Sequence, residues 1–151
     1  MGFSPLGLIV GLAVLAPNLL LMWFPPRVPV PKASVPRLLG WIERAGQALC
    51  LVVPAITSTG EHVGRWSVLM LVAITGYYAL WARYLFTGRD GAALYRSWCR
   101  VPVPMAILPV LMFLSTAAWL SNAWIAIAAV ILAVGHIPAS TLIAGATRPD
   151  S

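Results

Sequence analysis

The chain has 151 residues, of which 60% are hydrophobic and only 9% are charged. Soluble domains carry about 25% charged residues, so this composition, with a mean hydropathy of +0.88, excludes a water-soluble globule. The formal net charge is +6, but the basic residues lie between apolar runs, which indicates topology signals and contacts with anionic lipid rather than nucleic-acid binding.

The apolar runs predict an all-α membrane protein, a single integral membrane domain made of a bundle of five transmembrane helices. The expected ranges are about 5–24, 38–59, 66–86, 103–120 and 123–144. We expect the first helix to be retained rather than cleaved as a signal peptide, because no positive charge precedes it and no small-residue cleavage site follows it. Its Gly7, Gly11, Val14 and Asn18 share one face. This spacing predicts a close helix-packing seam with a buried amide.

A proline-rich connector follows the first helix, and residues 23–36 read WFPPRVPVPKASVP. Proline fixes φ and favours extended backbone in the residue before it, so we expect a stiff, non-helical segment. The second helix then carries a polar stripe, in which Glu43, Gln47, Cys50, Pro54 and Thr57 share one face. Lipid offers such groups no partner, so we expect the other helices to surround this one.

The third helix ends in an aromatic stripe of Tyr77, Trp81 and Tyr84, a pattern typical of an interfacial belt. In the loop after it, residues 92–98 predict a short amphipathic helix on the surface. Ser121 and Asn122 predict a tight turn into the fifth helix.

The distribution of the ten basic residues predicts the orientation in the membrane. Arg27, Lys32, Arg37 and Arg44 border the first connection, Arg83, Arg89, Arg96 and Arg100 border the third, Arg65 lies on the second and Arg148 on the tail. The positive-inside rule then places the first and third connections and the C-terminus in the cytoplasm, with the N-terminus outside. We expect a multi-pass protein of a bacterial cytoplasmic membrane.

With this orientation, depths compared at about 1.5 Å per residue predict a polar chamber in the cytoplasmic half of the bundle. The candidate ligand-binding residues are Asn18, Glu43, Arg44, Gln47, Tyr77, Trp81 and His136. The alternative is that these groups only satisfy one another and hold helices together, with each bond worth about 0.6 to 2 kcal/mol.

Six short motifs are distributed along the chain: PNLL at 17–20, FPP at 24–26, ERAGQ at 43–47, GRD at 88–90, PVPM at 102–105 and GHI at 135–137. Together they resemble a family of small, uncharacterised bacterial integral membrane proteins. The resemblance covers most of the chain. It implies a membrane bundle and no particular activity.

The sequence favours a non-enzymatic function, either binding of a lipid or small amphipathic ligand in the chamber or service as a membrane accessory subunit. One alternative is a membrane-embedded enzyme acting on a lipid head group, with His136 as acid or base and Arg44 or Arg83 stabilising negative charge. Another is a proton-coupled small transporter that uses Glu43 and His136. We expect no cofactor and no metal site, because His136 has no second ligand at a suitable spacing. The expected partners are membrane lipids and a homo-oligomer or membrane protein partner, with no nucleic acid.

Overall fold

The computed structural model describes residues 2–30 and 33–147, so Lys32 and Arg148, two of the predicted topology charges, lie outside the described residues. The helices are α1 Pro5–Trp23, α2 Arg37–Ile56, α3 Arg65–Phe86, α4 Pro104–Trp119 and α5 Ala123–Ala146, with the short 3-10 helix η1 Gly91–Leu94 before α4. The predicted all-α bundle of five helices is confirmed, although α4, with 16 residues, is shorter than the helices that could span a membrane. Four of them, α1, α2, α3 and α5, are long and apolar enough to cross a membrane. These helices suggest a multi-pass membrane protein.

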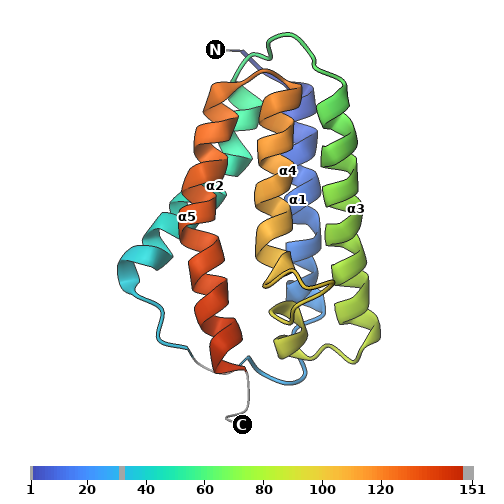
Figure 1. Ribbon diagram of the computed structural model, residues 1–151, viewed down its shortest axis with the longest axis vertical. Coiled ribbons are helices and arrows are strands. Elements are labelled where there is room, and N and C mark those ends of the chain that lie inside the picture. The colour runs from blue at the N-terminus through green and yellow to red at the C-terminus, as the bar shows by residue number, and fades with distance from the viewer. Residues whose placement is uncertain (1, 31–32, 148–151) are drawn as a thin grey trace.

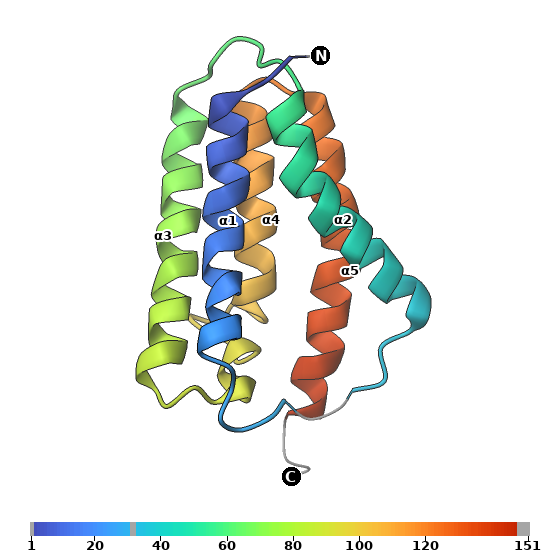
Figure 2. The ribbon, with the colours of Figure 1, turned by 180° about the vertical axis from the view of Figure 1, so that it is seen from behind.

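The helices run roughly along one axis, and the start of α1 and the end of α5 lie at opposite ends of the bundle (Figure 1). α1, α3 and α4 stand side by side, whereas α2 crosses α5 and tilts away from the rest with its N-terminal half (Figure 2). The most extensive helix contacts are those of α2 with α5, α3 with α4, α4 with α5 and α1 with α2. The fold is therefore two groups of helices joined through α4 and α5.

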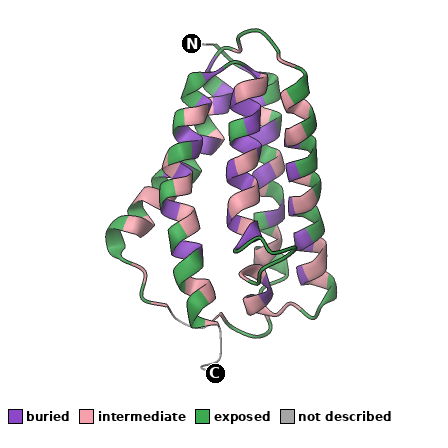
Figure 3. Ribbon diagram, viewed as in Figure 1, coloured by how far each residue is buried: buried purple, intermediate pink, exposed green. Residues whose placement is uncertain are grey.

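The centre of the bundle is α4, so the expectation that the other helices surround the second helix is wrong. α4 buries residues along its whole length (Figure 3). In α2, by contrast, Arg44 and Gln47 are exposed. The physical reason is that the buried polar side chains of α4 find hydrogen-bond partners within their own helix. The hydroxyls of Ser115 and Thr116 each donate to a carbonyl one turn earlier in α4, at 2.7 Å, so this helix can be enclosed without an unpaired polar side chain.

The glycines of the small-residue face of α1 pack against α2, as their spacing predicts, but Asn18 on the same face is exposed, so the predicted buried amide is wrong. A Cβ on Gly7 would overlap the carbonyl of Pro54, and one on Gly11 would lie 3.4 Å from the carbonyl oxygen of Leu51. Glycine is required at position 7 because α2 approaches too closely for any side chain. The helix-packing seam of α1 is therefore filled by α2 of the same chain.

The turn between α4 and α5 is held by Asn122, in agreement with the predicted tight turn. The side-chain oxygen of Asn122 accepts from the backbone N–H groups of Trp124 at 3.0 Å and Ile125 at 3.3 Å, and thus caps α5. Its amide nitrogen donates to the hydroxyl of Thr57 at 2.7 Å. One side chain therefore starts α5 and joins it to the end of α2.

The first and third connections meet at the end of the bundle opposite the N-terminus. The described part of the connector is non-helical, as predicted, and Val28 forms a parallel bridge with Asp90. The N–H of Arg27 donates to the carbonyl of Arg89 at 2.9 Å, and the N–H of Gly91 donates to the carbonyl of Val28 at 3.1 Å. These bonds require both connections to lie on the same side of a membrane.

The surface helix predicted over residues 92–98 is wrong. Only one 3-10 turn forms there, at η1, and Gly91 and Ala93 are buried. Asp90 caps the start of this turn, and Arg83 binds a carbonyl inside it. A carboxylate oxygen of Asp90 accepts from the N–H of Ala92 at 3.0 Å, and the guanidinium of Arg83 donates to the carbonyl of Ala93 at 3.2 Å.

Candidate ligand cavity

A cavity of about 620 Å³ lies between α1, α3 and α4 on one side and α2 and α5 on the other. This volume falls in the range of about 300 to 1,000 Å³ found for small-molecule sites. All seven candidate residues line it, namely Asn18, Glu43, Arg44, Gln47, Tyr77, Trp81 and His136. The structure therefore brings together side chains from four helices that are far apart in the sequence.

Two glycines bring α2 and α5 into backbone contact beside the cavity. A Cβ on Gly46 would lie 2.5 Å from the Cα of Leu132, and one on Gly135 would overlap the backbone of Glu43. No other residue fits at such a crossing without moving the helices apart. Because His136 follows Gly135, its ring is placed directly beside Glu43.

Glu43 and His136 form a polar pair at this crossing. The Nδ1 of His136 lies 2.7 Å from Oε1 of Glu43, and the side chains are 23% and 24% exposed, respectively. The amide nitrogen of Gln47 makes a longer contact of 3.4 Å with the same oxygen. The carboxylate of Glu43 is thus held by two side chains at the edge of the cavity.

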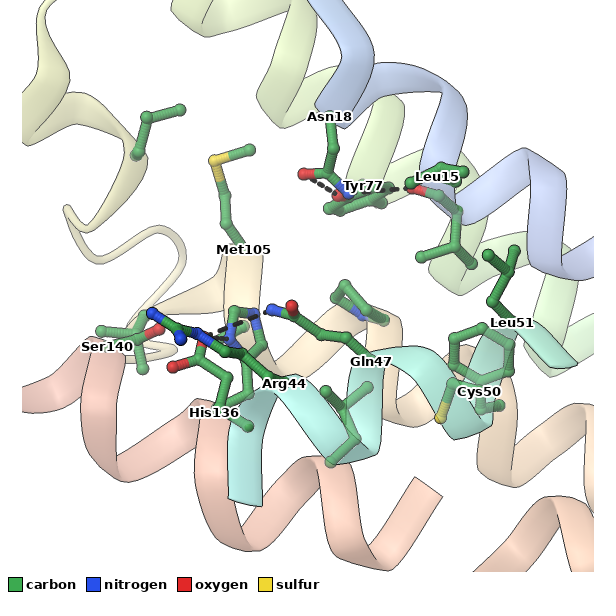
Figure 4. Close-up of a pocket in the computed structure, with 18 of the residues that line it drawn as sticks. Leu15, Asn18, Arg44, Gln47, Cys50, Leu51, Tyr77, Met105, His136 and Ser140 are labelled. Atoms are coloured by element: carbon green, nitrogen blue, oxygen red, sulfur yellow. Dashed lines mark hydrogen bonds and ion pairs between the residues drawn. The ribbon is translucent and has the colours of Figure 1, made fainter. Parts of the chain in front are cut away.

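Arg44 is the cationic group of the cavity and has no carboxylate within ion-pair distance among the described residues. Its guanidinium lies over the ring of Trp41, 5.6 Å from the ring centre. Figure 4 shows Arg44 beside His136 and Ser140 at one end of the cavity. Arg83, which sequence reasoning offered as a second cationic group, does not line the cavity, because it is bonded to η1.

Asn18 and Tyr77 form a second polar contact on the opposite wall. The hydroxyl of Tyr77 donates to the side-chain oxygen of Asn18 at 3.2 Å, and the amide nitrogen of Asn18 donates to the carbonyl of Val14 at 3.1 Å (Figure 4). Both Asn18 groups are therefore satisfied within the protein. This contact also joins α1 to α3.

The aromatic stripe of α3 is buried, so its interpretation as an interfacial belt is wrong. Tyr77, Trp81 and Tyr84 are exposed by no more than 3% and stack edge to face, with ring centres 6.4 and 5.7 Å apart. The hydroxyl of Tyr84 donates to the carbonyl of Phe24 at 2.9 Å. The Nε1 of Trp81 is buried without a partner among the described residues, which leaves one hydrogen-bond donor in the cavity wall.

Sequence reasoning missed two polar residues of the lining, Tyr95 and Ser140. Ser140 lies one turn after His136 on the same helix, and this spacing could have identified it. Tyr95 follows η1 in a loop, where no periodic pattern predicts its direction. Burial raises the pKa of its hydroxyl and the nearby Glu43 carboxylate raises that pKa further, so Tyr95 remains a neutral hydrogen-bond donor at pH 7.

The rest of the lining is mainly apolar and comes from α1, α2, α4 and α5. It includes Val14, Leu15, Leu21, Leu51, Met105, Ala106, Phe113 and Leu132. Among the described residues no three histidine, cysteine, aspartate or glutamate side chains lie close enough together to hold a metal ion. The cavity therefore offers an apolar wall and, at one end, a group of polar and charged side chains.

No protein-family model, curated protein or solved structure matches the chain.

Proposed function

We propose that the protein binds a lipid or another small amphipathic molecule in the cavity between its two groups of helices. The observation that carries this proposal is that the cavity lining is divided into a polar end and an apolar wall. The polar end is formed by Glu43, Arg44, Gln47 and His136, whereas Leu15, Leu51 and Phe113 belong to the apolar wall. An amphipathic molecule satisfies both parts at once, because its polar group meets the charged end while its hydrocarbon covers the wall.

The charges at the polar end favour a ligand with an acidic group. Glu43 is held by His136 at 2.7 Å, so its negative charge already has a partner. Arg44 has no carboxylate within ion-pair distance among the described residues, and its side chain is exposed, so its guanidinium is available to a ligand. An acidic head group beside Arg44 would gain charge-assisted hydrogen bonds from it.

The proposal places the protein in a bacterial cytoplasmic membrane with its N-terminus outside and its C-terminus in the cytoplasm. It is supported by the meeting of the first and third connections at one end of the bundle, where Arg27 and Arg89 are joined through their backbones. In that orientation the polar end of the cavity lies in the cytoplasmic half of the bilayer, at a depth that head groups and the first carbons of acyl chains occupy.

A steric substitution tests the proposal without removing a charge. Ala48 is exposed on α2 and lines this cavity, whereas Ala45 is exposed on the same helix and is not among the residues that line it. Ala48→Phe should fill the cavity, while Ala45→Phe adds the same side chain elsewhere. Native mass spectrometry of protein released from nanodiscs of bacterial lipid extract should then show a bound molecule on the wild type and on Ala45→Phe only.

Two outcomes would contradict the proposal. One is a wild-type protein that leaves the nanodisc without any bound molecule. The other is equal retention by Ala48→Phe and Ala45→Phe, which would place the bound molecule on the outer surface of the bundle.

A further inference from the structure

A second cavity, of about 490 Å³, lies between α2 and α5 where the two helices diverge. Figures 1 and 2 both show the N-terminal half of α2 leaving α5 on the side toward the proline-rich connector. Its lining includes Arg37, Gly40, Trp41 and Arg44 of α2 and Ile143 of α5. This cavity therefore lies outside the bundle core, on the face where α2 is tilted away.

The two cavities share four lining residues: Glu43, Arg44, Gln47 and Ile143. The polar end of the larger cavity is thus also one wall of the smaller one. Gln47 and Arg44 are exposed, and the contacts described for their side chains are with residues of α2 itself, the carboxylate of Glu43 and the ring of Trp41. A molecule of sufficient length can occupy both spaces, with its middle passing between these side chains.

The smaller cavity has two guanidinium groups on one face. Arg37 and Arg44 are seven residues apart on α2, which places them on the same side of the helix with about 10 Å of rise between them. Neither has a carboxylate within ion-pair distance among the described residues. Glu43, the acidic residue that lines both cavities, is held by His136. The smaller cavity therefore has an unneutralised positive charge.

We propose that the smaller cavity binds the phosphate of an anionic phospholipid and that an acyl chain of the same molecule enters the larger cavity past Arg44 and Gln47. This inference rests on the proposed function and specifies its ligand class and its route, which is lateral, from the membrane between α2 and α5. Phosphate fits because its oxygens accept paired N–H groups from guanidinium forks. Trp41, 67% exposed between the two arginines, is the kind of side chain that lies at head-group depth.

The charge requirement is tested with nanodiscs that hold equal amounts of phosphatidylglycerol and phosphatidylcholine. Native mass spectrometry then counts the lipids that each protein retains. The variant Arg37→Gln/Arg44→Gln removes both cations of the site. The control Arg65→Gln/Arg100→Gln removes the same total charge elsewhere, and Arg65 also lies over a tryptophan, 5.7 Å from the ring centre of Trp66.

The wild type and the control should retain phosphatidylglycerol in preference to phosphatidylcholine. The Arg37→Gln/Arg44→Gln variant should lose this preference by about tenfold or more. Both lipids carry a phosphate, but the trimethylammonium group of phosphatidylcholine offsets its negative charge, so the two guanidinium groups favour the net anionic head group of phosphatidylglycerol. Equal preference in this variant and the wild type would overturn the inference. An equal loss in the control would also overturn it, since the attraction would then come from net charge alone.

A second variant blocks the smaller cavity without changing its charge. A Cβ on Gly40 would meet no atom within 4 Å, so Gly40→Phe adds a ring into open space beside the two arginines. This variant should also lose the preference for phosphatidylglycerol. If Gly40→Phe keeps the wild-type preference, the head group does not lie in the smaller cavity and the inference is wrong.

The outcomes separate this inference from the proposed function. Loss of the bound molecule in Ala48→Phe, together with an unchanged lipid preference in Arg37→Gln/Arg44→Gln, would overturn the inference and leave the proposed function standing. In a last experiment, inorganic phosphate is added to the protein in detergent and a phosphate adduct is sought by native mass spectrometry. A phosphate adduct on a wild type that retains no lipid would assign the site to a soluble phosphate and overturn the lateral route.

Discussion

The contact between α2 and α5 gives the sharpest test of the fold, through the substitution Gly46→Ala. The new Cβ would lie 2.5 Å from the Cα of Leu132 and 2.6 Å from its nitrogen, where ordinary contacts begin at 3.4 Å. Backbone atoms cannot rotate away, so the two helices must separate by about 1 Å, at a cost of about 1 to 3 kcal/mol. Alanine returns up to about 1 kcal/mol, because it favours the helix over glycine.

Gly40→Ala is the matched control, because it lies on the same helix and its Cβ would meet no atom within 4 Å. Both variants gain the same helix propensity, so the difference between them isolates the contact at Gly46. We expect Gly46→Ala to be less stable than Gly40→Ala by about 1 to 3 kcal/mol, which lowers the melting temperature by about 2 to 12 °C.

Thermal unfolding in detergent, followed by tryptophan fluorescence, measures this difference. The same separation should also weaken the bond between Glu43 and His136, because Glu43 lies one turn before Gly46 on the surface that faces α5. If Gly46→Ala melts at or above the temperature of Gly40→Ala, α2 does not lie in backbone contact with α5, and the geometry of both cavities is wrong.

Two further predictions concern the ends of the bundle. Asn122→Ala removes the cap of α5 and the donor to Thr57, so it should cost about 1 to 3 kcal/mol in the same unfolding assay, and a change within error would show that the turn is not held by this side chain. Cys99 is exposed on the third connection and Cys50 is buried, so a membrane-impermeant maleimide should label Cys99 only after spheroplasts are permeabilised. With Cys99 replaced by serine, His62→Cys on the second connection should be labelled at once, and the reverse pattern would invert the proposed orientation.

The grouping of the candidate residues could be predicted from the sequence, because the constant rise per residue of a helix allows the depth of each residue in the membrane to be calculated from its number. Asn18, Tyr77 and His136 lie on three helices with a known rise per residue, so the basic connections were enough to align them. The packing of Gly7 was equally predictable, since small residues in an apolar run have few other uses.

The position of α2 could not be predicted from its polar stripe. The stripe indicates that these side chains must face either protein or water, but it does not distinguish between the two. Gln47 faces a cavity rather than a neighbouring helix, and this choice depends on the crossing set by Gly46 and Gly135. Nothing in a single sequence shows that these two glycines meet other chain segments. Tyr95 was missed for a related reason, since the direction of a loop side chain depends on tertiary contacts such as the bond from Arg83 to η1.

The pairing of Val28 with Asp90 sets an order of events during biosynthesis. The connector leaves the ribosome before α3 is made, but its backbone partners at Arg89 and Gly91 follow α3. The hairpin of α1 and α2 therefore cannot reach its final form until α3 has crossed the membrane and its loop has emerged on the same side as the connector. The emergence of residue 91 from the ribosome is the step at which this end of the bundle can close, and in a nascent chain arrested before it α1 is the main helix partner already available to α2.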